Sequence, residues 1–307
     1  MDEPRFRDAD RALWRRFGLE PTERWLDHAS LPTRIRALDV GTGAPVILIG
    51  GTGGTAAWWA PLVHELPGRR AIAIDRPGWG LGPPLDYRTV DFGSAVADIV
   101  AGVMDALEID RADVIGASIG GLWAFHAAIR HAERVGRIVI VGGMPHPEVA
   151  LPAFIKLLRT PLGAVLVRLP AREGMLRRQL VALGHGEALA RGALDPFIAW
   201  RLAFDGSTPS LRHERAMVKA ITAGDGMRSG VIPNDSALGT VTAPTLMVFG
   251  TADPTGNPDL WQRFTAHLPD ASLHLVERGG HMPFWDDPTG VGSSVARFLD
   301  GEPVAAT

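Results

Sequence analysis

The sequence predicts an α/β protein in which a mostly parallel sheet carries helices on both faces and one helical insertion. Short apolar runs rich in β-branched residues alternate with longer segments whose apolar residues recur at helical spacing. Such alternation is typical of a parallel sheet that is covered on both sides. The alternation stops between about 146 and 236, where the patterns are helical and broken by Pro and Gly, and a strand pattern returns at Pro244.

The individual elements follow from these runs. In chain order we expect strands at 24–28, 34–40, 46–50, 71–75, 112–116, 137–141, 244–249 and 272–277. Apolar residues at helical spacing predict helices at 92–108, 118–134, 258–268 and 289–299. We therefore expect a core domain built from residues 1–145 and 237–307. A helical cap over residues 146–236 is expected to lie across the edge of the sheet.

The net charge and the residue composition exclude several kinds of partner and site. Apolar residues make up 46% and charged residues 21% of the 307 residues, and the net charge is −3. This charge gives no reason to expect a nucleic acid or a membrane as partner. The absence of cysteine excludes disulfides, thiolate metal sites and a cysteine nucleophile. We expect a metal-free site, because no histidine pair or carboxylate cluster has the spacing of metal ligands. We also expect no cofactor, and a monomer or a homodimer.

The N-terminal segment MDEPRFRDADRALWRR lacks the apolar core of a signal peptide. No apolar run approaches the length of a membrane span. A cytoplasmic location is therefore the expectation.

The glycine-rich segment after the strand at 46–50 has two interpretations. Gly51, Gly53 and Ala56 match the dinucleotide-binding pattern G-x-G-x-x-A, and Asp75 follows at roughly the distance of a ribose-binding acid. The same loop could instead present backbone N–H groups to an oxygen atom that becomes negative during a reaction. A dinucleotide-binding strand normally begins its domain, whereas about 45 residues precede this one. The second interpretation is therefore favoured.

Ser118 lies in the sequence Gly-Ala-Ser-Ile-Gly, between an expected strand and an expected helix. This G-x-S-x-G pattern is typical of a nucleophile elbow, although a turn that merely contains serine would show the same letters. A serine on so tight a turn takes up a strained backbone conformation, and side chains two positions away would collide with the neighbouring strand and helix. Gly116 and Gly120 remove that collision, and Gly121 lets the helix pack closely. Ser118 is therefore the candidate nucleophile.

Two later loops offer the partners that a serine nucleophile needs, namely a base and an acid that orients the base. Asp253 lies in GTADPTGNP after the strand at 244–249, and His281 lies in RGGHMPFWDDP after the strand at 272–277. Taken singly, the aspartate would be interpreted as a helix cap and the histidine as a surface residue. Because the carboxyl ends of parallel strands lie at one edge of a sheet, we expect Ser118, Asp253 and His281 to converge.

On these motifs the chain resembles the α/β-hydrolase superfamily, in particular its capped, serine esterase-like branch. The resemblance covers residues 34–145 and 237–300 and rests on GGTGG, DRPGWG, GASIGG, GTADP and GGHMPFWDDP. It implies an α/β-hydrolase fold with an eight-stranded sheet and a helical cap inserted after the sixth strand. It also implies an oxyanion hole formed by the N–H groups of Thr52 and Ile119. Family members usually have His-Gly where this chain has Gly-Gly, just before Thr52.

The resemblance further implies a hydrolase that cleaves carboxylic esters, with a small apolar ester as substrate, through an acyl-enzyme on Ser118. His281 would act as the base and Asp253 would fix its tautomer. An alternative is a carbon–carbon bond hydrolase of ring-fission-type diketones, which resembles this chain in the order Ser, Asp, His and carries a cap arginine, here Arg201. Those hydrolases usually have Trp after the catalytic His, where this chain has Met282. A perhydrolase or an acyltransferase would use the same triad, and some relatives with intact triads serve as hormone receptors.

Five side chains are candidates for the substrate pocket, although packing is an alternative explanation for the aromatic ones. The candidates are Trp58, Trp59, His146, Arg201 and Trp285. The apolar segment 151–169 is interpreted as a cap helix that buries its face on the core and lines an apolar pocket, not as a membrane contact.

Overall fold

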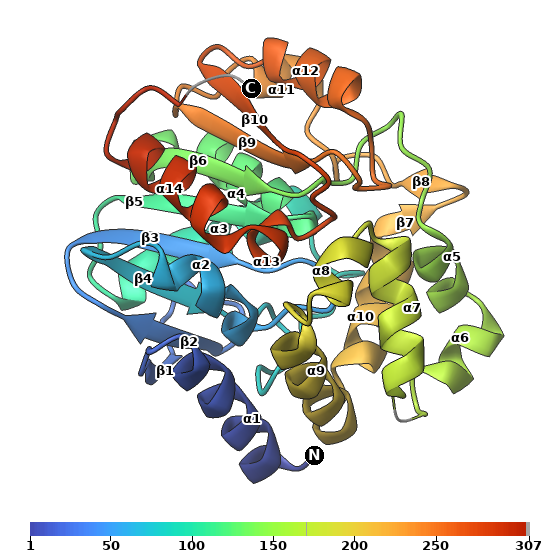
Figure 1. Cartoon of the computed structure of the whole chain (residues 1–307). Helices are drawn as coiled ribbons and strands as arrows, with labels where there is room; N and C mark the ends of the chain where they lie inside the picture. The colour runs from blue at the N-terminus through green and yellow to red at the C-terminus, as the bar shows by residue number, and fades with distance from the viewer. Residues whose placement is uncertain (170, 305–307) are drawn as a thin grey trace.

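The computed structural model describes residues 1–169 and 171–304, and Figure 1 shows a central sheet with a group of helices beside one end of it. All eight expected strands are present and form one sheet in the order β1-β2-β4-β3-β5-β6-β9-β10. β2 pairs antiparallel with both of its neighbours, and the remaining pairs are parallel. The strands are β1 (Thr22–Leu26), β2 (Ile35–Val40), β3 (Ala44–Ile49), β4 (Arg69–Ile74), β5 (Ala112–Ala117), β6 (Val135–Val141), β9 (Thr245–Gly250) and β10 (Ala271–Val276).

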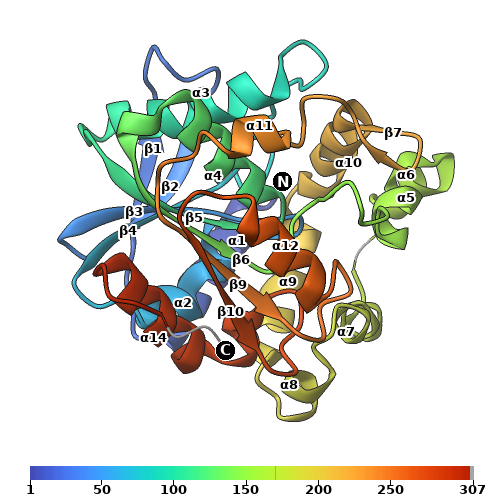
Figure 2. The ribbon, with the colours of Figure 1, turned by 90° about the horizontal axis from the view of Figure 1, so that it is seen from above.

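Helices cover both faces of the sheet, and a separate hydrophobic core lies on each side (Figure 2). One core contains residues of α3 (Phe92–Ala106), α4 (Ile119–Arg130) and α12 (Pro258–Ala266). The other contains residues of α1 (Glu3–Arg16), α2 (Ala60–His64) and α14 (Pro288–Leu299). On β3, Ile47 and Ile49 belong to the first core, whereas Val46 and Leu48 belong to the second. Because both faces of this strand are buried, its sequence is a continuous apolar run without polar alternation.

The N-terminal helix α1, which the sequence patterns did not predict, joins the sheet to the insertion. The buried carboxylate of Asp10 accepts a hydrogen bond of 2.8 Å from the indole N–H of Trp200, in α9 (Asp195–Ser207) of the insertion. The same carboxylate forms an ion pair of 2.9 Å with Arg36 of β2. The ring of Phe6 packs against that of Phe204, with centroids 5.8 Å apart. α1 therefore contacts both parts of the molecule through buried side chains.

The chain leaves the sheet after β6 and returns at β9, so the prediction of a helical cap after the sixth strand is confirmed. In Figure 1 the cap helices gather at the right, beside one end of the sheet. Besides α9 they are α5 (Ala153–Arg159), α6 (Pro161–Leu166), α7 (Glu173–Ala182), α8 (Gly186–Ala190) and α10 (Ser210–Ile221). A short hairpin, which was not expected, follows α10 and consists of β7 (Thr222–Ala223) and β8 (Gly226–Met227); α11 (Asp235–Leu238) comes next. The domain boundaries near 146 and 236 stay a prediction.

Within the described ranges, no helix combines the length and the apolar character that crossing a bilayer requires.

Candidate active site

Ser118 occupies a sharp turn between β5 and α4. Its backbone has φ 52° and ψ −122°, a region that side-chain-bearing residues rarely adopt. Such a conformation costs about 1–3 kcal/mol and persists only where the surrounding structure enforces it. Ser118 is partly exposed, whereas its neighbours on both sides are buried. The turn therefore presents the hydroxyl-bearing residue at the end of the strand.

The two glycines that flank the turn are required by close approaches. A Cβ atom at Gly116 would collide with the carbonyl oxygen of Gly120, and one at Gly120 would collide with the carbonyl oxygen of Ile49 in β3. These are the strand and helix collisions that the sequence pattern predicts. The elbow conformation is thus fixed by the backbone of the core itself.

Asp253 lies after β9 with its carboxylate fully hydrogen-bonded. Oδ2 accepts from the backbone N–H of Gly143 at 2.8 Å and lies 2.9 Å from Nδ1 of His281. Oδ1 accepts from both the backbone N–H and the hydroxyl of Thr255, at 2.9 and 2.7 Å. Burial raises the pKa of this carboxyl, but the charge of His281 and these hydrogen bonds outweigh burial and lower its pKa to about 2. The carboxylate is therefore ionised throughout the neutral range.

His281 lies in the loop after β10, and its side chain is 14% exposed. Burial lowers the pKa of the imidazole, but the charge of Asp253 and the hydrogen bond to it prevail, so the pKa lies above its ordinary value. The hydrogen bond at Nδ1 leaves Nε2 as the nitrogen that can accept a proton.

The nucleophile candidate lies close to this pair in the sheet. Ala117, which precedes Ser118, pairs with Val141 at the end of β6, and the next residues, Gly142 and Gly143, touch His281 and Asp253 respectively. The structure thus joins Asp253 to His281 directly and brings the elbow to the same edge of the sheet. No hydrogen bond links Ser118 to His281 in the described part of the chain.

The glycine-rich loop after β3 runs against the elbow. A Cβ at Gly51 would lie only 2.8 Å from the Cβ of Ser118, so only glycine permits this approach. Ile119 is the first residue of α4, and its N–H has no carbonyl one turn earlier to bind. Within residues 1–169 and 171–304 the N–H of Thr52 also donates to no protein acceptor. Both N–H groups are therefore free to bind an oxyanion beside Ser118.

Buried charged side chains bind this loop at Gly51, Thr52 and Gly53. Arg76, which follows β4, donates to the carbonyl oxygen of Gly51 at 2.9 Å. The hydroxyl of Thr52 donates at 2.7 Å to the carboxylate of Glu214, which comes from α10 of the cap and also accepts the indole N–H of Trp79.

Arg201, from α9 of the cap, donates to the carbonyl oxygen of Gly53 and forms an ion pair of 3.0 Å with Asp205. Its side chain is 9% exposed, and Nη2 has no hydrogen-bond partner among the described residues. Two cap residues, Glu214 and Arg201, thus fix the loop where family members usually have His-Gly.

The cap also holds the loop that carries His281. The backbone N–H of His281 donates to the carbonyl oxygen of Leu183 at 2.9 Å. His185, whose side chain is fully buried, accepts the N–H of Met282 at Nε2 (3.3 Å) and lies 2.9 Å from the carboxylate of Asp286 at Nδ1. Residues at the turn between α7 and α8 therefore set the position of the imidazole through its backbone.

The aromatic pocket candidates lie mainly in packed positions. Trp58 and Trp59 are 2% and 0% exposed, and the ring of Trp59 stacks on Phe284 with centroids 4.9 Å apart. Trp285 is 2% exposed and donates its indole N–H to the carbonyl oxygen of Trp58. His146 is half-buried between two aromatic rings of α12, and burial lowers its pKa. Of the five candidates, Arg201 is the one bonded to the loop beside Ser118.

Asp75, the acid of the dinucleotide interpretation, lies in the protein interior. Its side chain is fully buried, pairs with Arg36 at 2.9 Å and accepts the N–H of Ala56 at 2.8 Å. Both carboxylate oxygens are bonded and buried, so the side chain is not accessible to a ribose. The dinucleotide interpretation therefore finds no support. Within the described ranges, no group of three or more His, Asp or Glu side chains is arranged to hold a metal ion.

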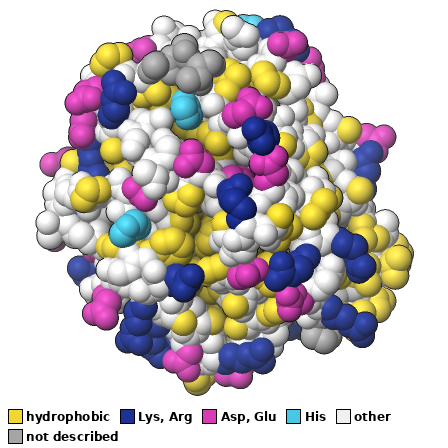
Figure 3. Space-filling view, in the orientation of Figure 1, with side chains coloured by type: hydrophobic (Ala, Val, Ile, Leu, Met, Phe, Trp, Pro, Cys, Tyr) yellow, Lys and Arg dark blue, Asp and Glu magenta, His cyan; other side chains and the backbone are white. Residues whose placement is uncertain are grey.

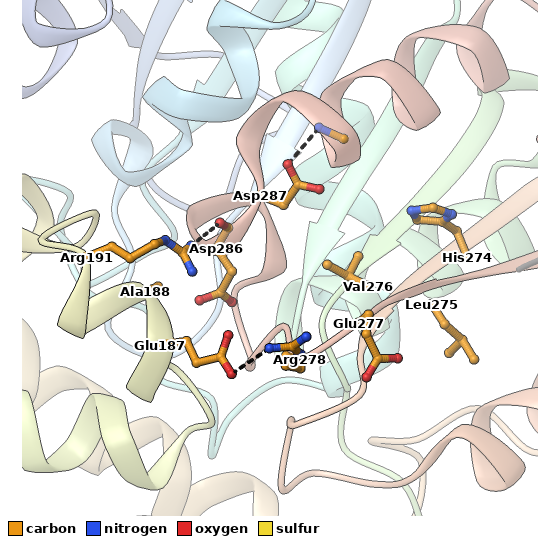
Figure 4. Close-up of a pocket in the computed structure, with 11 residues that line it drawn as sticks. Glu187, Ala188, Arg191, His274, Leu275, Val276, Glu277, Arg278, Asp286 and Asp287 are labelled. Carbon is orange, nitrogen blue, oxygen red and sulfur yellow. Dashed lines mark hydrogen bonds and ion pairs between the residues drawn. The ribbon is translucent and has the colours of Figure 1, made fainter.

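A surface cavity of about 460 Å³ lies at the outer edge of the sheet, between β10 and α8 (Figure 4). Charged side chains dominate its lining, and Glu187 and Arg278 pair across it at 3.3 Å. Ser118, Asp253 and His281 are not among its lining residues. This cavity is therefore separate from the candidate active site.

Glu214 and His185 are the site residues that the sequence predictions missed. Glu214 shares one face of α10 with Met217, Val218 and Ile221, all of them buried, so its helical spacing was a usable signal of a buried acid. His185 stands between two glycines, and nothing in its local sequence marks it.

The chain is similar to known proteins in sequence and in fold. A family model described as alpha/beta hydrolase fold matches residues 44–288. The chain is 31% identical over 278 residues to a 2-hydroxy-6-oxononadienedioate/2-hydroxy-6-oxononatrienedioate hydrolase of Cupriavidus pinatubonensis (strain JMP 134 / LMG 1197), covering 87% of this chain and 90% of that protein.

Two solved structures share the fold. One is 2-hydroxy-6-oxo-6-phenylhexa-2,4-dienoate hydrolase from Rhodococcus sp. strain RHA1, with a TM-score of 0.76, 20% identity and coverage of 92% of this chain and 99% of that one. The other is naproxen esterase (carboxylesterase NP) from Bacillus subtilis, with a TM-score of 0.74, 19% identity and coverage of 97% and 99%. From the family match and the sequence relatives together, the chain belongs to the α/β-hydrolase fold family and is a hydrolase.

Proposed function

We propose that this hydrolase cleaves a carbon–carbon bond next to a ketone in an acidic, conjugated diketone, with Ser118, His281 and Asp253 as its catalytic triad. The similarity to the Cupriavidus hydrolase carries the choice of substrate, because it extends over most of both chains. The name of that relative describes an oxo diacid without an ester or amide bond. Hydrolysis of such a compound breaks a bond between carbon atoms.

The geometry supports a role for each catalytic residue. His281 takes the proton of Ser118 as its oxygen attacks the ketone carbon, and Asp253 holds the imidazole in the tautomer that leaves Nε2 free. The N–H groups of Thr52 and Ile119 bind the oxyanion, and donors of this kind are each worth about 3 kcal/mol of barrier lowering. Water then releases the acyl group from Ser118 as a carboxylic acid.

The leaving group distinguishes this reaction from ester hydrolysis. When the tetrahedral intermediate collapses, the electron pair of the broken carbon–carbon bond passes into the conjugated carbonyl as an enolate, which takes the proton held by His281. The net reaction consumes one water and gives an acid and an enol. The free Nη2 of Arg201 offers a charged donor to a substrate carboxylate beside the oxyanion loop.

Carboxylic ester hydrolysis is the second candidate, because two observations favour it. Arg201 already pairs with Asp205, which offsets its charge toward a substrate. Met282 follows His281 where ring-fission hydrolases usually have Trp. The alcohol part of an ester leaves as an alkoxide. No conjugated system is then needed to accept the electron pair.

The test compares two substrates on three proteins. We expect wild type to turn over an oxo-dienedioate with a higher kcat/KM than p-nitrophenyl acetate, and Ser118→Ala to lose both activities. Arg201→Gln should raise KM for the diacid and leave KM for the uncharged ester unchanged. Turnover of p-nitrophenyl esters alone would replace the proposal by the second candidate. Activity that survives in Ser118→Ala would contradict the assigned nucleophile.

A further inference from the structure

The cap carries an unusual concentration of exposed apolar side chains. Among the residues that the structure describes, every large apolar side chain that is exposed, apart from Met1, lies between 162 and 181. These residues are 39% to 58% exposed and define what we call the α6–α7 face: Leu162, Val165, Leu166, Leu169, Met175 and Val181. The prediction that segment 151–169 buries its apolar face therefore fails for its second half. Exposed apolar side chains concentrated in one segment of a cap favour an interaction site.

The same segment carries unpaired positive charge. Arg168, Arg172 and Arg178 are exposed, and their guanidinium groups have no ion-pair partner within residues 1–169 and 171–304. Glu173 is the sole acid between 153 and 182, and it pairs with Arg177 at 2.8 Å. Residues 153–182 therefore carry an excess of positive charge, although the chain as a whole has a net charge of −3. In Figure 3 apolar and basic side chains lie side by side at the right edge, where Figure 1 places α5 to α7.

We propose that the α6–α7 face docks on the surface of an anionic lipid bilayer. Apolar side chains that enter the boundary between headgroups and acyl chains, ringed by arginines that bind lipid phosphates, are the features that hold a protein on such a surface. This inference concerns a partner and is independent of which bond the enzyme cleaves. It revises the expectation, drawn from net charge alone, that a membrane is not a partner.

Charge argues against a second copy of the chain as the occupant. A symmetric dimer brings the same patch of both subunits together. The α6–α7 face would then place three unpaired arginines against three others, with no free acid between 153 and 182 to offset them. Juxtaposed like charges of this kind are strongly unfavourable. An anionic surface satisfies the same arginines.

The docking surface is connected to the catalytic loop. α7 buries Leu176 and Leu180 on the side opposite to the face, and the turn after α7 supplies the carbonyl oxygen of Leu183 that receives the N–H of His281. An enzyme docked in this way holds its cap against the layer in which apolar compounds dissolve.

The experiment is flotation of the full chain with vesicles of phosphatidylcholine alone or with phosphatidylglycerol. We expect the protein to float with the anionic vesicles only, and binding to fall as salt is raised. Replacing Arg168, Arg172 and Arg178 by Gln should reduce the partition coefficient about 10²-fold, from the contribution of a basic residue near an anionic surface. A matched control replaces Arg11, Arg15 and Arg16, three exposed arginines of α1, by Gln and should bind like wild type.

A second variant, Val165→Ser with Leu169→Ser, should weaken flotation without changing activity on a soluble substrate, because both side chains are exposed. Absence of wild-type flotation with anionic vesicles would overturn the proposal. Equal losses in the two arginine triple variants would do the same, since binding would then follow net charge and not this face. A dimer in solution that the serine variant dissociates would assign the face to a second copy instead.

Discussion

The elbow that carries Ser118 and the two loops that face it are held in different ways. Close backbone packing within the core holds the elbow, where Gly116 and Gly120 leave no room for a side chain against α4 and β3. The facing loops take contacts from the cap as well as from the core. Glu214 and Arg201 bind the loop at 51–53, and Leu183 and His185 bind the loop at 281–282.

This difference shows that the cap is part of the scaffold of the site and more than a cover. The contacts described for the proposed nucleophile and for the carboxylate of its acid come from residues of the core. The insertion supplies the carboxylate of Glu214 that binds the hydroxyl of Thr52, and the backbone carbonyl oxygen of Leu183 that binds the N–H of His281. Substitutions in the cap should therefore alter the rate of the chemical step as well as substrate binding.

The largest effect should come from the core side of the comparison, on replacing Asp253 by Asn. The amide cannot hold the imidazole in the productive tautomer, so kcat should fall by up to about 10⁴-fold. Steady-state kinetics on the preferred substrate measure this loss, and thermal unfolding shows whether the fold persists. A rate within tenfold of wild type would place the acid elsewhere.

On the cap side, Thr52→Val should lower kcat by about 10- to 10²-fold, because it removes the bond to Glu214 while keeping the backbone N–H. Thr52→Ser keeps the hydroxyl and is the matched control, expected near the wild-type rate. Affinity for a trifluoromethyl ketone, which forms a tetrahedral oxyanion on serine, should fall by the same factor as kcat/KM. An unchanged affinity would separate Glu214 from the oxyanion loop.

A smaller loss, about 10-fold in kcat, is expected for His185→Phe, which keeps a ring but cannot accept the N–H of Met282. A buried polar group that loses its partner costs about 1–3 kcal/mol, so the melting temperature should fall as well. His185→Gln retains an acceptor and should recover part of the rate at neutral pH. If both variants lose stability but keep full kcat, His185 supports the fold without positioning His281.

The smallest change should appear in the pH profile. His281 must be neutral to take a proton, and Asp253 raises the pKa of the imidazole above 6.5, so kcat/KM should fall as pH drops through that raised pKa. In Asp253→Asn the supporting charge is lost, and the acid limb should move to lower pH. A limb that does not move in this variant would mean that another group titrates.

The sequence predicted the parts of the molecule that local patterns determine. Apolar runs buried on both faces gave all eight strands, and the glycine spacing around Ser118 gave the elbow, because each depends on residues close together in the chain. The order of Asp253 and His281 after their strands gave the hydrogen-bonded pair, since parallel strands end at one edge.

The cap contacts were beyond such patterns, because they join residues far apart in the chain. Thr52 and Glu214 are 162 positions apart, and Met282 and His185 are 97 apart. The exposure of Leu162 and Leu169 likewise depends on how short helices pack against each other. The periodicity of apolar residues in the sequence does not determine this packing. The motifs predicted a hydrolase with ester cleavage as the first choice, whereas the proposed carbon–carbon bond cleavage, the alternative from the sequence, rests on similarity to relatives.

The position of α1 bears on how substrates enter. Lifting the insertion from the sheet requires either breaking the Asp10–Trp200 bond and the Phe6–Phe204 contact or carrying the first sixteen residues along. A purification tag fused before Glu3 therefore lies close to the contacts between α1 and α9. Any movement of the cap away from the sheet is therefore coupled to α1.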